Sequence, residues 1–239
     1  MGQVPTSETA PIGIVGDGRV ARHFHHYFDL LGLPVRTWSR RKPAARPVDA
    51  LAMCRTILLL ISDTAIVPFV REWAPWPDKQ LVHFSGSLVT DLASGAHPLM
   101  SFGETLYDLA TYRSIPFILN EGGPSFSVLL PQLENPSFTI PPHDRPYYHA
   151  LCVMAGNFST LLWLKLFDEF SARWGIPATA AHPYLVRTAA NLLTDPDGAF
   201  TGPLTRGDAQ TVAANLEALD HDPFRGVYAA FTRAYASRS

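Results

Sequence analysis

The stretch that decides the fold is IGIVGDGRVA, residues 12–21, near the start of the 239-residue chain. Its first four letters are a short apolar run, typical of a buried strand, and glycines follow at once. Apolar side chains then recur at helical spacing as far as Leu31, and Gly32 ends the helix that they predict. PVRTW, residues 34–38, is the next predicted strand. The order strand, glycine turn, helix, strand predicts a βαβ unit with a right-handed crossover.

The glycine turn has the spacing G-x-G-x-x-A, which is typical of dinucleotide binding when a strand precedes it and a helix follows. Gly16 permits the tight turn, Gly18 lets the backbone approach a pyrophosphate, and Ala21 lets helix and strand pack closely. Amide groups at the start of the helix then bind the phosphates. We therefore expect Gly16, Gly18, Arg19 and Val20 to bind a dinucleotide cofactor. A plain glycine turn is the alternative.

The end of the second strand indicates which dinucleotide binds. NAD sites place Asp or Glu there for the ribose hydroxyls, whereas this chain has Ser39, Arg40, Arg41 and Lys42. Cationic side chains suit the 2′-phosphate of NADP. The sequence therefore predicts NADP as the cofactor, with a solvated basic turn as the alternative.

Two further strand ends should complete the cofactor site, because ligands bind beyond the carboxyl ends of parallel strands. TILLLI (56–61) and QLVHF (80–84) are predicted strands, with a helix between them at 64–73. Ile61 and Ser62 end the third strand, and Ser85 and Gly86 follow the fourth, so all four are expected at the cofactor. For Ser85 to Ser87, capping a helix at 88–93 is the alternative.

Strands alternate with helices up to about residue 144, and helices alone follow. Weaker strands are predicted at 98–102, 116–120 and 137–140, with a helix at 125–133. Later helices are predicted at 147–174, 178–193, 208–219 and 223–236. The fold class is α/β: after a disordered leader at 1–10, a Rossmann-type, mostly parallel sheet domain at 11–144, then an all-α domain at 145–239.

Composition narrows the classes of partner. A formal net charge of −2 gives no sign of a nucleic-acid binder, and two cysteines cannot make a disulfide framework, which fits a reducing compartment. The apolar run ILLLI is much shorter than the roughly 20 residues of a membrane span. We expect a soluble, cytoplasmic protein that acts on a small molecule, with no nucleic-acid or membrane partner. The predicted helix at 147–174 is apolar on much of its circumference, which favours a homodimer through the helical domain.

Several longer motifs occur in order along the chain: SRR, LLLISDTAI, VHFSGS, HPLMSFG, YHALCVMAGNF and TGPLTRGDAQTV. Together with IGIVGDGRVA they resemble a family of bacterial proteins with a Rossmann-like NADP-binding domain and a helical domain of unknown function. That family is a distant relative of pyrroline-5-carboxylate reductase and the 6-phosphogluconate dehydrogenase group. The resemblance covers nearly the whole chain. It implies an NADP-dependent oxidoreductase whose helical domain, often dimeric in the wider group, closes over the nicotinamide; it implies no substrate.

The sequence departs from its relatives in two places. Between Arg41 and Thr56 the chain is short and rich in Pro and Ala, where relatives have a full helix. Related hydroxyacid dehydrogenases carry a Lys four residues before an Asn on the first long C-terminal helix. Here Asn157 is present, but Val153 stands four residues before it. The proton-donating lysine is therefore missing, and Lys165, two turns further on, is no obvious substitute.

Histidines are then the candidate proton donors, because their pKa lies near neutrality. His149 and Asn157 are eight residues apart, a little over two helical turns, so they are expected on one helix face as a catalytic donor and an orienting group. His97 is a third catalytic candidate. A buried, hydrogen-bonded His and Asn at a helix interface is the alternative.

A second group of histidines lies on the first helix. His23, His25 and His26 are expected on a solvated helix face, and no carboxylate or Cys completes a metal site there. The sequence therefore predicts no metal.

The stretch TGPLTRGD, residues 201–208, contains an Arg-Gly-Asp tripeptide, but an adhesion role would need an extracellular protein. Asp208 is expected at the start of the helix at 208–219, where its negative charge is favourable. Thr201 and Arg206 lie on the loop before that helix and are predicted to bind the substrate or its carboxylate.

The predicted function is an NADP-dependent oxidoreductase that transfers hydride between NADPH and a small carbonyl, imine or hydroxy compound. Such chemistry needs a positioned nicotinamide, a proton donor and a group that polarises the acceptor. The alternative is an NADP-binding sensor without turnover, which the missing lysine favours. A third reading is a structural dimer whose nucleotide site has decayed.

Overall fold

The computed structural model of the protein describes residues 10–41 and 45–237. The predicted leader, apart from Ala10, and the predicted cofactor contact Lys42 lie outside the described residues. Two compact units divide the chain, one up to Ser159 and the other from Thr160. The domain boundary predicted between residues 144 and 145 lies within the first of these units, at the start of a helix (Arg145–Cys152), and it stays a prediction.

A seven-stranded sheet lies at the centre of the first unit, in the order β2-β1-β3-β4-β5-β6-β7. The strands are β1 (Ile12–Val15), β2 (Val35–Trp38), β3 (Thr56–Leu59), β4 (Gln80–His83), β5 (Ser94–Pro98), β6 (Phe117–Asn120) and β7 (Ser137–Ile140). Neighbouring strands run parallel except for β5 and β6, which are antiparallel. The predicted α/β class with a mostly parallel sheet is therefore confirmed.

The position of β5 corrects one predicted strand. The apolar run at 98–102 indicates a strand, yet the strand is Ser94–Pro98 and none follows at 99–102. Its first residues are small, and a Cβ on Gly95 would lie 2.6 Å from Nη2 of Arg145. Tertiary packing therefore requires a small residue here, which a search for apolar runs does not detect.

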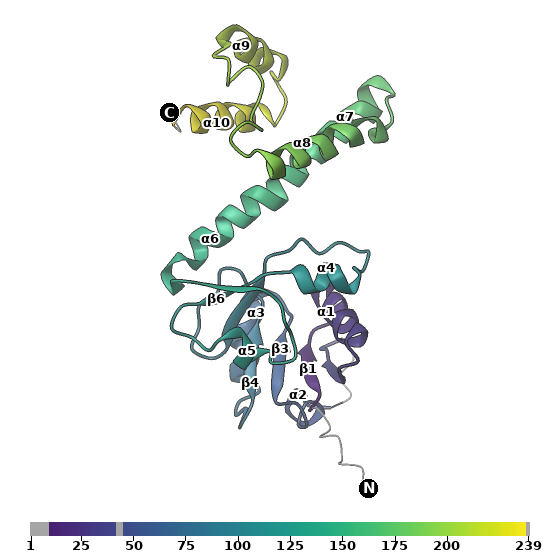
Figure 1. Ribbon diagram of the computed structural model, residues 1–239, viewed down its shortest axis with the longest axis vertical. Coiled ribbons are helices and arrows are strands. Elements are labelled where there is room, and N and C mark those ends of the chain that lie inside the picture. The colour runs from purple at the N-terminus through teal and green to yellow at the C-terminus, as the bar shows by residue number, and fades with distance from the viewer. Residues whose placement is uncertain (1–9, 42–44, 238–239) are drawn as a thin grey trace. The chain divides into compact units, whose positions relative to one another are not determined.

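Each face of the sheet has its own apolar core, because successive strand residues point to opposite faces. On one face, Leu58 belongs to the cluster that packs α1 (Arg19–Leu30), α4 (Leu109–Ser114) and α5 (Phe126–Leu129). Figure 1 shows α1 and α4 beside one another. On the other face, Ile57 and Leu59 pack with α3 (Asp63–Glu72) and with Leu51, which follows α2 (Pro47–Ala50).

A continuous helical segment leads from the first unit into the second. It consists of η1 (Pro142–Asp144), α6 (Arg145–Cys152), the π-helical η2 (Val153–Phe158) and α7 (Ser159–Trp174). Its large apolar side chains Leu151, Met154, Phe158, Leu161 and Leu164 are 46–55% exposed. By length and composition alone, the helix from Pro142 to Trp174 could cross a membrane, which is weak evidence because a core helix of a soluble protein passes the same test.

The second unit contains helices that the sequence predicts well. After α7 come η3 (Ala178–Ala181), α8 (His182–Thr194), α9 (Ala209–Ala218) and α10 (Arg225–Ala236). Asp208 caps α9, because its Oδ1 accepts from the Thr211 amide at 3.0 Å and its Oδ2 from the Thr211 hydroxyl at 2.7 Å. These hydrogen bonds hold the pKa of Asp208 below its usual value.

Candidate functional site

The glycine turn between β1 and α1 has the backbone that a dinucleotide site needs. Gly16 has a φ of +127°, and a Cβ there would lie 2.3 Å from the carbonyl oxygen of Leu60. Gly18 is the N-cap of α1, and a Cβ there would meet nothing within 4 Å. Gly16 is therefore required by the fold itself, whereas Gly18 leaves open space at a helix N-terminus, where an anion is favoured.

A cavity of about 450 Å³ lies along this turn. Its lining comes from the carboxyl ends of β1, β3 and β4, the edge at which parallel α/β sheets bind ligands. The predicted cofactor residues that line it are Gly16, Gly18, Arg19, Val20, Ile61, Ser62 and Ser85. The structure thus brings together side chains that the sequence places on three separate segments.

The Ser85 side chain is fixed in the wall of this cavity. Its hydroxyl donates to Oδ2 of Asp63 at 2.5 Å and accepts from the amides of Ser87 at 3.3 Å and Leu88 at 3.0 Å. No helix forms at 88–93, so the helix-cap alternative is wrong and the serine instead caps a turn. The Asp63 contact was not predicted, because a residue 22 positions away leaves no local signal.

The residues predicted to select NADP follow β2 but do not line the cavity. Arg40 and Arg41 are exposed, and Ser39 is half-buried. Nη1 of Arg41 lies 3.8 Å from Oδ1 of Asp17, which does line the cavity. With the arginine side chain 82% exposed, this ion pair is weak and leaves the guanidinium free to bind another anion.

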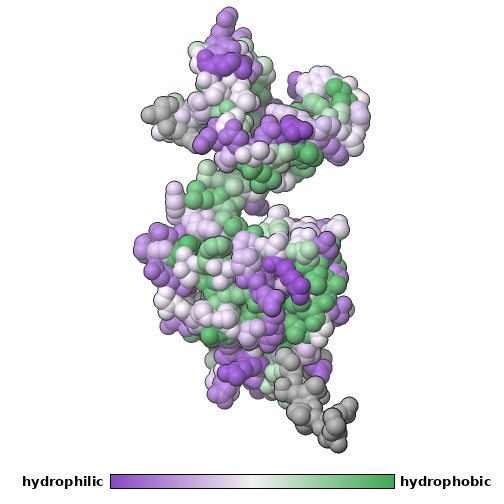
Figure 2. Space-filling view, in the orientation of Figure 1, coloured by the Kyte–Doolittle hydropathy of each residue, from purple (hydrophilic) through white to green (hydrophobic). Residues whose placement is uncertain are grey.

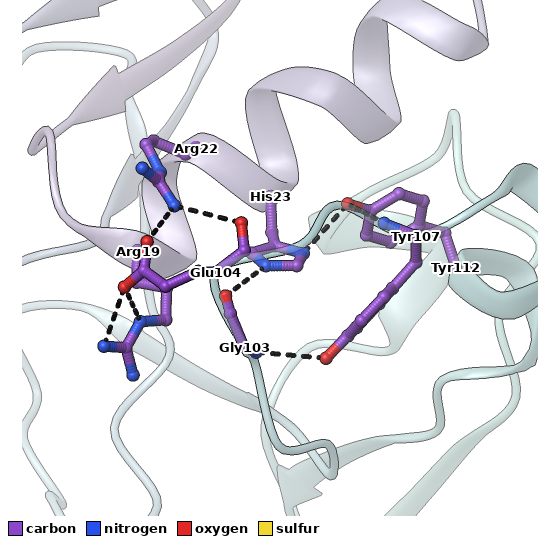
Figure 3. Close-up of polar contacts among 7 residues, drawn as sticks. All are labelled: Arg19, Arg22, His23, Gly103, Glu104, Tyr107 and Tyr112. Atoms are coloured by element: carbon purple, nitrogen blue, oxygen red, sulfur yellow. Dashed lines mark hydrogen bonds and ion pairs between the residues drawn. The ribbon is translucent and has the colours of Figure 1, made fainter.

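One carboxylate holds two arginines of α1 (Figure 3). Arg19 donates from Nε to Oε1 of Glu104 at 3.0 Å, and Arg22 donates from Nη2 to Oε2 at 2.7 Å. These contacts, Arg22 first, hold the pKa of Glu104 below its usual value. The predicted role of Arg19 as a cofactor ligand stays a prediction. The glutamate was not predicted, since 85 positions separate the two residues.

The same loop is attached to α1 through His23, and here the sequence analysis was wrong. The expected solvated histidine is fully buried: Nε2 donates to the Gly103 carbonyl and Nδ1 accepts from the Tyr112 hydroxyl, both at 2.9 Å. The carbonyl can only accept, which fixes this tautomer. Figure 3 shows the network, which Tyr107 extends. Within the described residues there is no group of three potential metal ligands.

The two predicted catalytic histidines lie together. The ring centroids of His97 on β5 and His149 on α6 are 5.6 Å apart, with nearly perpendicular rings. The His149 ring lies against Gly86, where a Cβ would be 2.1 Å from Nδ1. Gly86 directly follows Ser85, the last residue of the cavity lining, whereas Gly86, His97 and His149 do not line the cavity themselves.

The third predicted catalytic residue, Asn157, lies in η2, where the π-helical hydrogen bonds span five residues and widen the turn. Its side chain is exposed, and in the described part of the chain it makes no hydrogen bond with His149. Its predicted role as an orienting group stays a prediction.

The predicted substrate residues lie in the second unit. Thr201 lines a largely apolar cavity of about 400 Å³, together with Leu162, Lys165 and Phe224. Arg206 is exposed on the loop before α9. Nζ of Lys165 donates to carboxylate oxygens of Glu169 and Asp222, each at 2.7 Å, which agrees with its exclusion as a proton donor.

Comparisons with known proteins identify the class to which this architecture belongs. A protein of Bacteroides fragilis assigned as an NADP oxidoreductase is 19% identical, with a TM-score of 0.76 over 95% of this chain and 98% of its own. The imine reductase of Streptomyces aurantiacus is 15% identical, with a TM-score of 0.63 over 95% and 93%. Pyrroline carboxylate reductase of Plasmodium falciparum, solved with NADP bound, is 12% identical, with a TM-score of 0.61 over 97% of each chain. No curated protein sequence matches this chain.

The fold is therefore that of Rossmann-type NADP oxidoreductases with a helical C-terminal part. Residues 122–235 match the family model described as Domain of unknown function (DUF2520). The predicted resemblance to proteins that join a Rossmann-like domain to a helical domain of unknown function is confirmed.

Proposed function

We propose that the protein is an NADPH-dependent reductase of a small carbonyl or imine compound, working in either direction between NADPH and the corresponding hydroxy or amino compound. The observation that carries this proposal is the turn at Gly16, whose φ and contact with Leu60 only glycine tolerates, next to a cavity at the carboxyl edge of the sheet. The NADP bound to the pyrroline carboxylate reductase of the same fold supports the choice of cofactor.

NADP is favoured over NAD by the residues that follow β2. No carboxylate is present there to bind the ribose hydroxyls, and two exposed arginines, Arg40 and Arg41, are available for the 2′-phosphate. A guanidinium binds phosphate through charge-assisted hydrogen bonds of roughly 1.5–3 kcal/mol each.

The cavity beside the glycine turn has a polar end that could bind a small polar substrate. Ser62, Asp63 and Ser85 supply hydroxyl and carboxylate groups, and His97 lies on the neighbouring strand β5 in contact with His149 of α6. We assign the proton-handling step to this pair, and keep Asn157, Thr201 and Arg206 as proposed contacts for orienting the substrate. We also propose that the protein is soluble and cytoplasmic.

The helical part is proposed to form a homodimer. Apolar surface gathers along the helix Pro142–Trp174, as the green colour in Figure 2 shows. A second copy of the same helix would remove these side chains from water. Dimer formation and cofactor binding are separate proposals, and neither depends on the other.

A fluorescence titration tests the cofactor. We expect NADPH to bind and NADH to bind at least 10-fold more weakly, because only NADPH carries the 2′-phosphate. The double variant Arg40→Ala/Arg41→Ala should weaken NADPH binding about 10- to 100-fold and leave NADH unchanged. Arg71→Ala, which removes another exposed arginine of the first unit, is the control.

Turnover separates the reductase from the alternative sensor. NADPH oxidation is followed against a panel of keto acids, ketones and cyclic imines. Turnover of any member supports the reductase, whereas tight NADPH binding without turnover across the panel would favour the sensor. Failure to bind either nucleotide would contradict both.

A further inference from the structure

A cluster of polar side chains lies beneath the carboxyl end of β4 and β5. His83 and His97 come from these strands, and Arg145, Tyr148 and His149 come from the first two turns of α6. The register of β4 and β5 pairs His83 with Gly95, so His97 lies two residues further on, level with Ser85 in the wall of the cofactor cavity. All of these residues belong to the first compact unit.

The central contact of the cluster joins His97 to Tyr148. Nδ1 of His97 lies 2.7 Å from the Tyr148 hydroxyl. The phenol proton needs an acceptor, and its other neighbour is the thiol of Cys152, which is a weak one. The phenol therefore donates to Nδ1, which places the remaining imidazole proton of neutral His97 on Nε2.

His97 is neutral at physiological pH because of its surroundings. Burial, followed by His149 and Arg145, lowers its pKa to about 4, and Asp63 opposes this only in part. Burial and the Cys152 thiol raise the pKa of Tyr148 above its usual value, so the phenol is protonated too. Nε2 of His97 makes no hydrogen bond in the described residues and is not one of their fully buried polar atoms without a partner, and the residue as a whole is half-buried.

We propose that Tyr148 is the proton source of the reaction and that His97 carries the proton, with Nε2–H donating to the oxygen or nitrogen of the substrate. This inference rests on the proposed reductase function. Hydride from NADPH forms the new C–H bond, and the electron pair of the C=O or C=N bond moves to the heteroatom. The heteroatom takes the Nε2 proton while Nδ1 takes the phenol proton, so His97 changes tautomer and stays neutral. A tyrosinate is left and is reprotonated from water.

Arg145 is the group that stabilises the tyrosinate formed in this step. Its side chain is fully buried; Nη1 donates to the Ile118 carbonyl at 3.1 Å, while Nε and Nη2 have no partner in the described part of the chain. Among the described residues, no carboxylate affects the pKa of Arg145, and Tyr148 is the one titrating group that favours its charge. An uncompensated buried cation is costly unless an anion forms nearby. The tyrosinate is that anion.

The positive charge has a second effect on the same cluster. Burial is the main cause of the lowered pKa of His83 and of His97, and the charge of Arg145 lowers both pKa values further, which disfavours uptake of a proton by either imidazole. His97 can then pass a proton from Tyr148 to the substrate without becoming a cation. Arg145 and His83 are positioning residues in this proposal, because they act through His97 and Tyr148.

Nitrogen-15 NMR of the full-length protein, labelled at histidine, tests the tautomer without any substrate. We expect His97, assigned by comparison with His97→Gln, to be neutral with its proton on Nε2 from pH 5.5 to pH 8. In Tyr148→Phe the Nδ1 resonance should shift, because its hydrogen bond is lost. Tyr147→Phe, which alters the neighbouring tyrosine that is 69% exposed, should leave the spectrum unchanged. A proton on Nδ1, or a cationic His97 at pH 7, would overturn the proposal.

Kinetics with the substrate found in the panel give the second readout. Tyr148→Phe should lower kcat about 100-fold, the lower end of the range for general acid catalysis, with KM and NADPH affinity within about 2-fold of the wild type. Tyr147→Phe should match the wild type. An unchanged kcat in Tyr148→Phe would overturn the relay even with the expected tautomer. Lack of NADPH binding or turnover by the wild type would instead count against the proposed function, while the NMR result still decides the tautomer.

Discussion

At the scale of single residues, the two glycines of the first turn have different tasks. Gly16 is held at a positive φ against the backbone of Leu60, whereas Gly18 has open space above it. The sequence motif treats them as equal members of one pattern. The structure shows that the first serves the fold and the second leaves room for a ligand.

Substitution by alanine separates these tasks. Gly16→Ala should destabilise the protein by about 1–3 kcal/mol, because the new Cβ meets the Leu60 carbonyl and the backbone is strained. Gly18→Ala should leave stability within about 0.5 kcal/mol but weaken NADPH binding, since the methyl group occupies the space above the helix N-terminus. Urea unfolding and NADPH titration measure both. Equal stability of the two variants would contradict the assignment.

Buried histidine is the second feature at this scale, and it makes stability depend on pH. Burial and Arg145 lower the pKa of His83 to about 4, and neither ring nitrogen has a hydrogen-bond partner in the described residues. Between pH 4 and 6.5 the unfolded chain therefore binds more protons than the folded one. Stability should fall as pH is lowered through this window, by roughly 1–2 kcal/mol at pH 5 for this histidine.

His83→Leu isolates that contribution. The variant should lose less stability between pH 7 and pH 5 than the wild type, because one of the two histidines with a lowered pKa is gone, while the half-buried His97 still contributes. Chemical unfolding at the two pH values gives the difference. The control is His143→Gln, since the His143 side chain is 81% exposed. If His83→Leu loses as much unfolding free energy between pH 7 and pH 5 as the wild type does, the assignment of a lowered pKa to His83 is contradicted.

At the scale of elements, the helical segment from Pro142 to Trp174 is unusual because a π-helical stretch interrupts it. The π-helical stretch η2 separates α6, which carries Tyr148 and His149 of the proposed proton-handling cluster, from α7, whose large apolar side chains are about half exposed. The sequence predicts the helix and its apolar character, but a 3.6-residue period cannot reveal a π-helical turn. The angular relation of His149 and Asn157 therefore needed the structure.

Charges on α7 test whether a second copy covers it. Leu161→Glu/Leu164→Glu should convert a dimer into a monomer, because both side chains are about 50% exposed and are three residues apart on one helix face. Light scattering after gel filtration gives the mass. Ser171→Glu, at another exposed position of α7, is the control. A wild-type monomer would contradict the dimer, and binding of the wild type but not the variant to lipid vesicles would favour a membrane surface instead.

At the scale of the whole molecule, the sequence predicts the arrangement of its elements better than their contacts. The strands at 12–15 and 137–140 and the later helices lie where apolar patterns place them. The strand β5 does not, because its small residues are selected by Arg145 and His83 above them. The short helices α2 and α4 are also absent from the prediction, since one or two turns carry too little periodicity.

The same division holds for the candidate site. Most residues that line the cavity at the carboxyl edge of the sheet were predictable as neighbours, because a glycine turn and the ends of parallel strands follow from local patterns and a general rule of sheet topology. Their role in binding a cofactor stays a prediction. Glu104 on the arginines and Tyr148 on His97 were not, since 85 and 51 positions separate the partners. Burial of His23 was missed for the same reason.

The sequence by itself determined the Rossmann-type class, the nucleotide turn and the helical second part, because periodicity and glycine spacing are local properties that short segments carry in full. Only the tertiary structure decided which polar side chains meet, which of them lose contact with water, and where a buried cation has no anion. Those properties depend on segments far apart in the chain, since burial and electrostatic interaction act through space and not along the sequence.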